Sequence, residues 1–320
     1  MRHDDQVEDM NDTMQAISQD ELGGPEVLKR VTLPTPKPGM GEILVRVHAA
    51  SVNPADVMNR QTGVFVGKPP FVLGWDVSGM VEAVGPGVTL YKPGDEVFGM
   101  LPFPHGHGAY AQYAVGPTRV FVPKPERLDH VQASAIPLAG LAAWQALVET
   151  AHVGQRSRVL INGAAGGVGH LAVQIAKARG AHVIALASAS NTEFVRSLGA
   201  DEVIDYATTD FTQAVRDVDV VLEVIGGDYA VKALEVLKPG GILVSTLPPT
   251  LAPAKADAIK RGIHLAGLFV EADRLGMTAL ADLAATGKLT PTIAATFPLD
   301  QAATAQSTKS GHGKTVLTLV

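Results

Sequence analysis

The sequence of 320 residues contains no cysteine. Disulfide bonds, thiolate nucleophiles and zinc sites with thiolate ligands are therefore excluded. The chain also lacks a run of about 18 apolar residues, which a membrane-spanning helix needs. Its N-terminal segment, MRHDDQVEDMNDTMQ, has no apolar stretch of the kind found in signal peptides. We expect a cytoplasmic protein without a membrane partner.

Basic runs are likewise absent. The 26 lysine and arginine residues are outnumbered by 32 acidic residues, which gives a net charge of −6. A surface for nucleic acid or anionic membranes needs clustered positive charge, so the composition favours a small molecule as partner. Hydrophobic residues make up 46% of the chain, enough to form the cores of two domains.

The most informative segment is residues 160–187, LINGAAGGVGHLAVQIAKARGAHVIALA. It contains an apolar strand, a glycine-rich turn, a helix with apolar residues on one face, and a second apolar strand. This order is typical of a βαβ unit that binds a dinucleotide, because small residues let the backbone approach a pyrophosphate at the helix N-terminus. We predict that Gly166, Gly167 and Val168 bind the phosphates.

The second strand ends in residues 185–190, ALASAS, without an acidic residue. Sites that prefer NAD carry a carboxylate here, which binds the ribose hydroxyls and repels a 2′-phosphate. A carboxylate about 4 Å from a phosphate charge costs roughly 4 kcal/mol at an effective dielectric constant near 20. The sequence therefore favours NADPH as cofactor, with Ser188 and Ser190 as donors to the 2′-phosphate. Alternatively, these serines end the strand or cap a helix that begins near Thr192.

The organisation along the chain predicts an α/β fold with two domains. Residues 1–13 are polar and acidic, and we expect a disordered leader there. Residues 14–137 form short β-rich runs broken by Pro and Gly, which predicts an antiparallel, barrel-like domain that ends in a helical stretch. Strands and helices alternate over 138–272, which predicts a doubly wound parallel sheet of six strands. Residues 273–320 contain a helix and a final strand that should complete the first domain, because a terminal strand needs a sheet edge.

Six motifs extend this interpretation beyond the glycine turn: SVNPADVMNRQTG at 51, GWDVSGMVEAVG at 74, PLAGLAAWQAL at 137, NGAAGGVGHLAVQIAK at 162, LGADEVIDY at 198 and VLKPGG at 236. In this order they resemble the zinc-independent quinone oxidoreductase branch of the medium-chain dehydrogenase/reductase superfamily. The resemblance covers the chain from about residue 14 to the C-terminus. It implies a catalytic domain with a GroES-like β-barrel, a Rossmann domain inserted after it, NADPH as hydride donor and a homodimer.

The resemblance also implies that no metal is bound. Zinc-dependent relatives place a cysteine where this chain has Asn53, and a histidine–glutamate pair where it has Trp75 and Asp76. Catalytic zinc needs three protein ligands, so these replacements argue against Lewis-acid chemistry. His105 and His107 share a glycine-rich loop that we expect to be solvated and to line the cleft between the domains.

Further cofactor contacts are implied by the same resemblance. Asn53 matches an asparagine on the cofactor side, where its amide can bond the nicotinamide ribose or the substrate carbonyl and would be the catalytic residue. The alternative is an Asn–Pro turn that satisfies its own backbone. Tyr206 matches a tyrosine by the adenosine phosphate, or else packs at a strand end. The remaining predicted contacts are Ile225, Phe269, Val270 and Lys314.

These residues predict an NADPH-dependent oxidoreductase that reduces quinones from the nicotinamide without a metal. A reduced quinone oxygen can take its proton from solvent, which suits a chain with Met58 near the place where several related reductases carry a tyrosine. Asp56 is expected to pair with Arg60 or to support the site from behind. Two alternatives stay open: an NADPH-dependent reductase of α,β-unsaturated ketones, aldehydes or thioesters, and a non-catalytic NADPH-binding sensor or crystallin-like protein.

Overall fold

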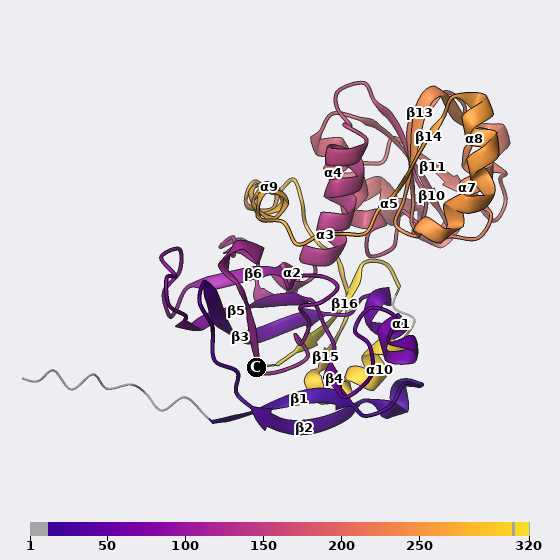
Figure 1. Cartoon of the computed structure of the whole chain (residues 1–320). Helices are drawn as coiled ribbons and strands as arrows, with labels where there is room; N and C mark the ends of the chain where they lie inside the picture. Colours follow the sequence, from indigo (N-terminus) through magenta and orange to yellow (C-terminus); the bar gives the residue numbers. More distant parts are fainter. Residues whose placement is uncertain (1–11, 309–310, 320) are drawn as a thin grey trace, which may run out of the picture.

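The computed structural model describes residues 12–308 and 311–319. Figure 1 shows antiparallel strands in its lower part and a parallel sheet flanked by helices in its upper part. Most of the predicted disordered leader lies outside the described residues. Thr13 already belongs to β1 (Thr13–Gln19), so the predicted leader extends one residue too far.

Two sheets form the lower part. β1 lies between β2 (Lys29–Pro34) and β4 (Phe71–Val72) in a three-stranded sheet. The second sheet has the order β15-β16-β3-β5-β6-β8, and β7 also pairs with β3. Its strands are β3 Glu42–Ser51, β5 Asp76–Val84, β6 Glu96–Met100, β7 Tyr113–Pro117, β8 Phe121–Pro123, β15 Ile293–Pro298 and β16 Lys314–Thr318. The C-terminal strand β16 therefore pairs with β3, far away in the sequence.

The upper part is one parallel sheet of six strands in the order β11-β10-β9-β12-β13-β14. The strands are β9 Arg158–Ile161, β10 His182–Ala187, β11 Glu202–Asp205, β12 Val218–Glu223, β13 Leu237–Ser245 and β14 His264–Gly267. The central strands β9, β10 and β12 are rich in apolar residues because both of their faces are covered, whereas the edge strands β11 and β14 are only partly buried. Val159 and Ile161 pack into one core cluster with Leu171 of a flanking helix, whereas Leu160 packs into another with Ala230 on the opposite face.

The chain leaves the middle of this sheet in two directions. From β9 it runs outward to β10 and β11, and it then returns to β12 on the other side of β9. Ligands of open parallel sheets bind at the carboxyl ends of the strands where the order reverses. The turn after β9 and the turn after β12 are therefore the expected edges of a ligand site.

Helices cover the sheets and join the two parts. They are α1 Pro54–Thr62, α2 His130–Ser134, α3 Pro137–Trp144, α4 Gly169–Ala178, α5 Thr192–Ser197, α6 Phe211–Ala214, α7 Tyr229–Ala233, α8 Lys255–Arg261, α9 Arg274–Ala285 and α10 Ala302–Ser307, with a π-helix at Gln145–Thr150. Short 3-10 turns occupy Pro25–Val27, Thr118–Val120, Ala189–Asn191, Pro248–Ala254 and Leu299–Gln301. The helical stretch before the parallel sheet is broken between α2 and α3, because Pro137 cannot donate to the preceding turn and begins a new helix instead.

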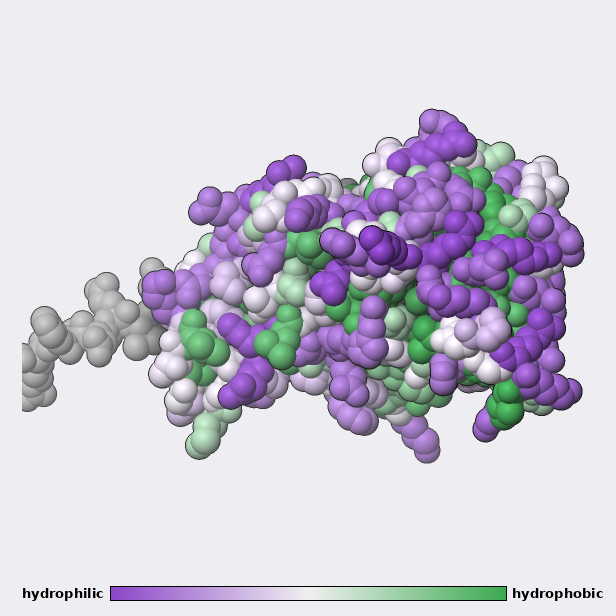
Figure 2. Space-filling view, turned by 90° about the horizontal axis from the view of Figure 1, so that it is seen from above, coloured by the Kyte–Doolittle hydropathy of each residue, from purple (hydrophilic) through white to green (hydrophobic). Residues whose placement is uncertain are grey.

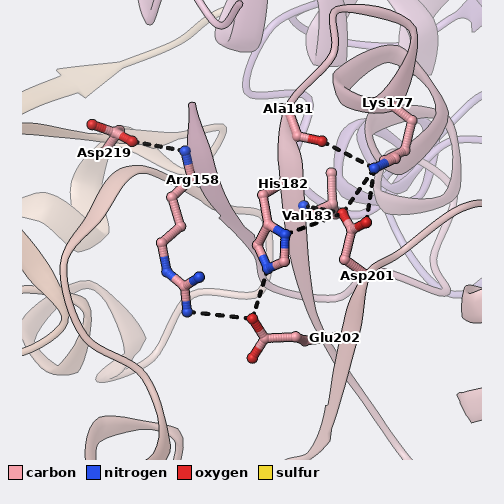
Figure 3. Close-up of polar contacts among 8 residues, drawn as sticks. All are labelled: Arg158, Lys177, Ala181, His182, Val183, Asp201, Glu202 and Asp219. Carbon is pink, nitrogen blue, oxygen red and sulfur yellow. Dashed lines mark hydrogen bonds and ion pairs between the residues drawn. The ribbon is translucent and has the colours of Figure 1, made fainter. Parts of the chain in front are cut away.

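The amino ends of three neighbouring strands are joined by hydrogen bonds and ion pairs, drawn in Figure 3. Glu202 of β11 lies 3.3 Å from Arg158 of β9 and 2.7 Å from His182 of β10. Lys177 of α4 pairs with Asp201 at 2.8 Å. These polar contacts lie at the amino ends of the strands and help to fix their register. The carboxyl ends, where a ligand is expected, are at the opposite side of the sheet.

The outer surface carries no extended apolar belt on the face seen in Figure 2, where hydrophilic and hydrophobic residues are mixed. In the described part of the chain, no helix has both the length and the apolar character required to cross a membrane.

Candidate functional site

The glycine-rich turn between β9 and α4 presents several backbone N–H groups that have no hydrogen-bond partner among the described residues. Gly163 has a φ of +69°, and a Cβ on Gly169 would lie 2.1 Å from the Gly163 carbonyl oxygen, so both positions need glycine. Within residues 12–308 and 311–319, no backbone hydrogen bond is donated by the N–H of Ala165, Gly167 or Val168. These donors lie at the N-terminus of α4, which carries a partial positive charge. The turn is therefore built to accept an anion such as a pyrophosphate.

His170 ties this turn to the segment that leads into β15. Its Nδ1 lies 2.9 Å from the carbonyl oxygen of Gly166, which is exposed at the tip of the turn. Its Nε2 accepts the N–H of Thr292 at 3.1 Å, so Nδ1 carries the proton and the ring is neutral. Burial lowers the pKa of His170 to about 4. Sequence reasoning missed this residue because a histidine on the covered face of a helix gives no separate signal.

Asn53, at the N-cap of α1, is held in a buried polar cluster. Its Nδ2 donates to Asp76 Oδ2 at 2.7 Å, and its Oδ1 accepts a hydrogen bond from Lys314 Nζ. Its backbone N–H donates to Asp56 Oδ2 at 2.7 Å, which closes a capping box. The amide is thus fixed in orientation by a cation on one side and a carboxylate on the other. The second Nδ2 hydrogen makes no hydrogen bond within the described residues.

Asp76 and Lys314 complete the cluster. Asp76 Oδ1 accepts the N–H of Leu138 at 2.6 Å, and Asp76 Oδ2 also accepts the hydroxyl of Ser51. Lys314 Nζ donates to the Val52 carbonyl at 3.1 Å and lies 3.8 Å from Asp76 Oδ2. Burial lowers the pKa of Lys314, while the two nearby carboxylates oppose this shift. The ammonium group is therefore committed to protein acceptors.

Lys314 also brings this cluster against the glycine turn. A Cβ on Gly167 would lie 3.1 Å from Lys314 Cδ, so the methylene chain of the lysine packs on the turn. The next residue back, Gly313, donates its N–H to the Ala165 carbonyl at 3.0 Å. The predicted phosphate residues, Asn53 and Lys314 are thus adjacent in space although they come from three distant segments.

Asp56 lies behind Asn53 and is fully buried. Burial raises the pKa of Asp56 to about 7; Asp76 adds to the rise, whereas the Asn53 N–H and Lys314 oppose it. The expected pairing with Arg60 is wrong. Arg60 donates instead to the Gly23 carbonyl at 3.2 Å and to Gln306 Oε1 at 2.7 Å.

The turn after β12 forms the second edge of the site. Glu223 is buried and accepts from Asn162 Nδ2 at 2.6 Å, from Gly226 N–H at 2.6 Å and from Ile225 N–H. This carboxylate fixes the turn in a shape that leaves the Ile225 side chain 53% exposed. Ile225 also contacts the glycine turn, because a Cβ on Gly163 would lie 2.7 Å from Ile225 Cδ1.

Phe269 and Val270 follow β14 on a short strap between the two parts of the molecule. Gln145 fixes this strap through two bonds with the backbone of Glu271, at 2.8 and 3.0 Å. Phe269 is 57% exposed, and its ring lies 6.0 Å from the ring of Phe65 in the lower part. An apolar surface therefore continues across the junction.

The strand-end residues lie together at the third edge. Ser188 Oγ and Ser190 Oγ are 3.0 Å apart, and Asn191 Nδ2 donates to Ser188 Oγ at 3.1 Å. Tyr206, after β11, donates its backbone N–H to the Ala187 carbonyl at 3.3 Å, and its side chain is 51% exposed. The assignments of all these residues to cofactor or substrate stay predictions.

Comparisons with known proteins agree with this fold. Residues 39–126 match the model of the alcohol dehydrogenase GroES-like domain, and residues 198–317 match that of zinc-binding dehydrogenase. The mouse (Mus musculus) protein "NAD(P)H oxidoreductase RTN4IP1, mitochondrial" is 34% identical, over 87% of this chain and 82% of the relative. The quinone oxidoreductase of Pongo abelii is 32% identical, over 96% of this chain and 98% of the relative.

Solved structures include a quinone oxidoreductase from Coxiella burnetii, with a TM-score of 0.90 and 36% identity, covering 96% of this chain and all of that one. This chain belongs to the quinone oxidoreductase branch of the medium-chain dehydrogenase/reductase superfamily. It is an α/β oxidoreductase that depends on NAD(P)H and acts on a small molecule, with a GroES-like domain and a Rossmann-like parallel sheet. The predicted family and fold are thus confirmed, and the predicted activity and cofactor are confirmed in this coarser form.

The positions of the zinc ligands in metal-dependent relatives are filled by other groups in this oxidoreductase. Trp75 is fully buried and packs 5.1 Å from the ring of Phe103. Asp76 uses both carboxylate oxygens for protein donors, as described above. His107 Nδ1 lies 2.7 Å from the Val72 carbonyl, so the loop that carries it is fixed to the lower part. In the part of the chain that the structure describes, no three His, Cys, Asp or Glu side chains gather so as to hold a metal ion.

Proposed function

We propose that this chain is an NADPH-dependent oxidoreductase that reduces quinones without a metal. The observation that carries the proposal is the anion-accepting turn at 163–169, which adjoins the fixed amide of Asn53 at the switch point of the sheet. When bound, NADPH supplies a hydride. The residues of the chain bind this cofactor, orient the acceptor and exclude water.

Each group has a distinct part in this proposal. The N–H groups of Ala165, Gly167 and Val168 bind the pyrophosphate, and Ser188 and Ser190 donate to the 2′-phosphate. The free Nδ2 hydrogen of Asn53 bonds the nicotinamide ribose or the acceptor carbonyl. The apolar surface of Ile225, Phe269 and Val270 keeps water away from the reacting atoms.

The metal-free part of the proposal is supported by the donors themselves. An indole is not a zinc ligand, an amide is a poor one, and Asp76 has no oxygen without a protein donor. Activity in the presence of a chelator would support it, and activity that is lost on chelation and restored by Zn²⁺ would contradict it.

Quinone reduction is tested by following NADPH oxidation with a panel of benzoquinones and naphthoquinones. We expect acceptor-dependent loss of NADPH absorbance. No such loss at saturating cofactor would overturn the proposal and favour the non-catalytic alternative if NADPH still binds. A preference for enones over quinones of more than tenfold in kcat/KM, about 1.4 kcal/mol, would favour the enone reductase instead.

Cofactor preference is tested by the Kd values of NADPH and NADH for the parent and for Ser188→Asp. We expect the parent to prefer NADPH. The new carboxylate should weaken NADPH binding by about tenfold to a thousandfold through repulsion of the 2′-phosphate, with Ser188→Ala as the control. Equal Kd values in the parent would contradict the preference.

A homodimer is also proposed. β14 is the last strand of the parallel sheet, so its outer backbone groups can pair with a second copy. Light scattering on the purified protein tests this, and a monomer at micromolar concentration would refute it. Residence in the cytoplasm stays a prediction, which cell fractionation tests.

A further inference from the structure

His312 links the glycine turn to the end of β10. Its ring stacks on Phe194 of α5, with ring centroids 3.9 Å apart and an interplanar angle of 21°. Its Nδ1 lies 3.4 Å from Asn191 Oδ1. The adjacent Gly313 is bonded to Ala165 in the turn, so the backbone beside His312 is held against the predicted phosphate site.

The direction of the hydrogen bonds can be assigned from this contact. An amide oxygen only accepts, so His312 Nδ1 donates to Asn191 Oδ1. Asn191 Nδ2 then donates to Ser188 Oγ at 3.1 Å. This bond occupies a lone pair of the Ser188 hydroxyl, so the hydroxyl proton can be donated to Ser190 or to a ligand. Successive bonds of this kind polarise one another. The chain of groups therefore presents the two hydroxyls as donors, and Ser190 is exposed.

Among the described residues, this chain of groups contains no carboxylate, and the acidic side chains near it are bonded elsewhere. On α5, Glu193 is paired with Arg196 at 2.8 Å. Asp205, whose backbone lies opposite Ala187, accepts from the Ala207 N–H and the Thr208 hydroxyl, both at 3.1 Å. A phosphate that approaches the serines therefore meets hydrogen-bond donors. No basic residue directly follows the serines in the sequence to bind the phosphate in their place.

We propose that His312 is a positioning residue for cofactor choice: through Asn191 it holds Ser188 and Ser190 as donors to the 2′-phosphate of NADPH. NADH carries a neutral hydroxyl in place of this phosphate, so the orientation of the serines should matter less for its binding. The inference rests on the proposed function, because it specifies how that site distinguishes the two cofactors.

Two variants separate the donor from the ring. His312→Phe keeps the stacking on Phe194 and removes the donor to Asn191, whereas His312→Gln keeps an N–H donor and loses the ring. We expect His312→Phe to raise the Kd of NADPH about threefold to tenfold, the worth of a hydrogen bond, and to leave that of NADH within twofold. His312→Gln should recover most of the affinity. Titration with 2′,5′-ADP and 5′-AMP should repeat the pattern without the nicotinamide.

A double-mutant cycle tests the route through the serines. If His312 acts through Ser188, His312→Phe should change the Kd of NADPH little once Ser188 is replaced by alanine. An undiminished effect in that background would overturn the inference.

The remaining outcomes distinguish this inference from the proposed function. A His312→Phe protein that keeps the full preference for NADPH overturns the inference alone. Equal losses for NADPH and NADH also overturn it, because they indicate a general structural role. A parent that binds the two cofactors equally, or binds neither, overturns the cofactor assignment and the inference together.

Discussion

Two aspartates in the buried cluster should respond to the same substitution in opposite ways. Asp56 is buried without an ion-pair partner, and the pKa of its carboxyl is raised from 3.8 to about 7. Asp56→Asn keeps an oxygen to accept the Asn53 N–H and removes a charge that is costly above pH 7. Because one pH unit corresponds to about 1.4 kcal/mol, the stabilisation is at most about 4 kcal/mol, and partial solvent relaxation should leave about 1–3 kcal/mol.

Asp76→Asn should destabilise the fold. Asp76 accepts from Ser51, Asn53 and Leu138 and stands 3.8 Å from Lys314 Nζ. An asparagine has one acceptor oxygen for these donors, and it leaves the buried lysine without its nearest counter-charge. Breaking a buried pair in this way costs about 3–5 kcal/mol.

The pH dependence supplies the sharper test. A carboxyl whose folded pKa is raised holds its proton in the folded state while the unfolded chain has lost it, so stability falls as pH rises from about 4 to about 7. The advantage of Asp56→Asn over the parent should therefore grow across this window and level off above pH 7. Melting temperatures of parent, Asp56→Asn and Asp76→Asn at pH 5, 6, 7 and 8 measure it. Shifts of the same sign in both variants, or an advantage that shrinks as pH rises, would refute the reasoning.

Three further predictions concern other parts of the fold. Gly169→Ala places a Cβ 2.1 Å from the Gly163 carbonyl oxygen. We expect the free energy of unfolding to fall by about 1–3 kcal/mol and dinucleotide binding to weaken. An unchanged melting temperature would contradict this prediction. Arg274 Nη1 donates to the Tyr91 hydroxyl and to the Phe121 carbonyl, both at 2.8 Å. Arg274→Met removes this donor, and urea denaturation should show a loss of about 1–2 kcal/mol, which would be absent if α9 docks by apolar contacts alone. Burial lowers the pKa of His130 from 6.5 to about 4, so the folded protein loses stability as pH falls through this range. The melting temperature of His130→Gln should therefore depend less on pH between pH 7 and 5 than that of the parent. An equal dependence in the two proteins would count against this reasoning.

Much of the parallel sheet could be predicted from the sequence because its signals are local. The central strands are apolar runs, and the turn at 163–169 carries its glycines within a few residues of both elements that it joins. The break at Pro137 was available from the same local chemistry, since a proline favours the start of a helix.

The buried cluster could not be predicted in the same way. Asn53 and Asp76 are 23 residues apart, and Asn53 and Lys314 are 261 residues apart. Polar residues at the ends of strands and helices give no sign of burial until the strands are paired. His312 shows the same limit, because its partners Asn191 and Phe194 belong to the other part of the chain.

The position of β16 has a consequence for synthesis of the protein. It lies between β15 and β3, although β3 precedes it by more than 250 residues. β7 pairs with β3 only over Glu42–Arg46, so the edge of β3 at Ala49–Ser51 has no neighbouring strand until β16 has left the ribosome. This strand also carries Lys314, so a chain stalled before residue 314 would contain all six strands of the parallel sheet but no lysine to hold the amide of Asn53 in place.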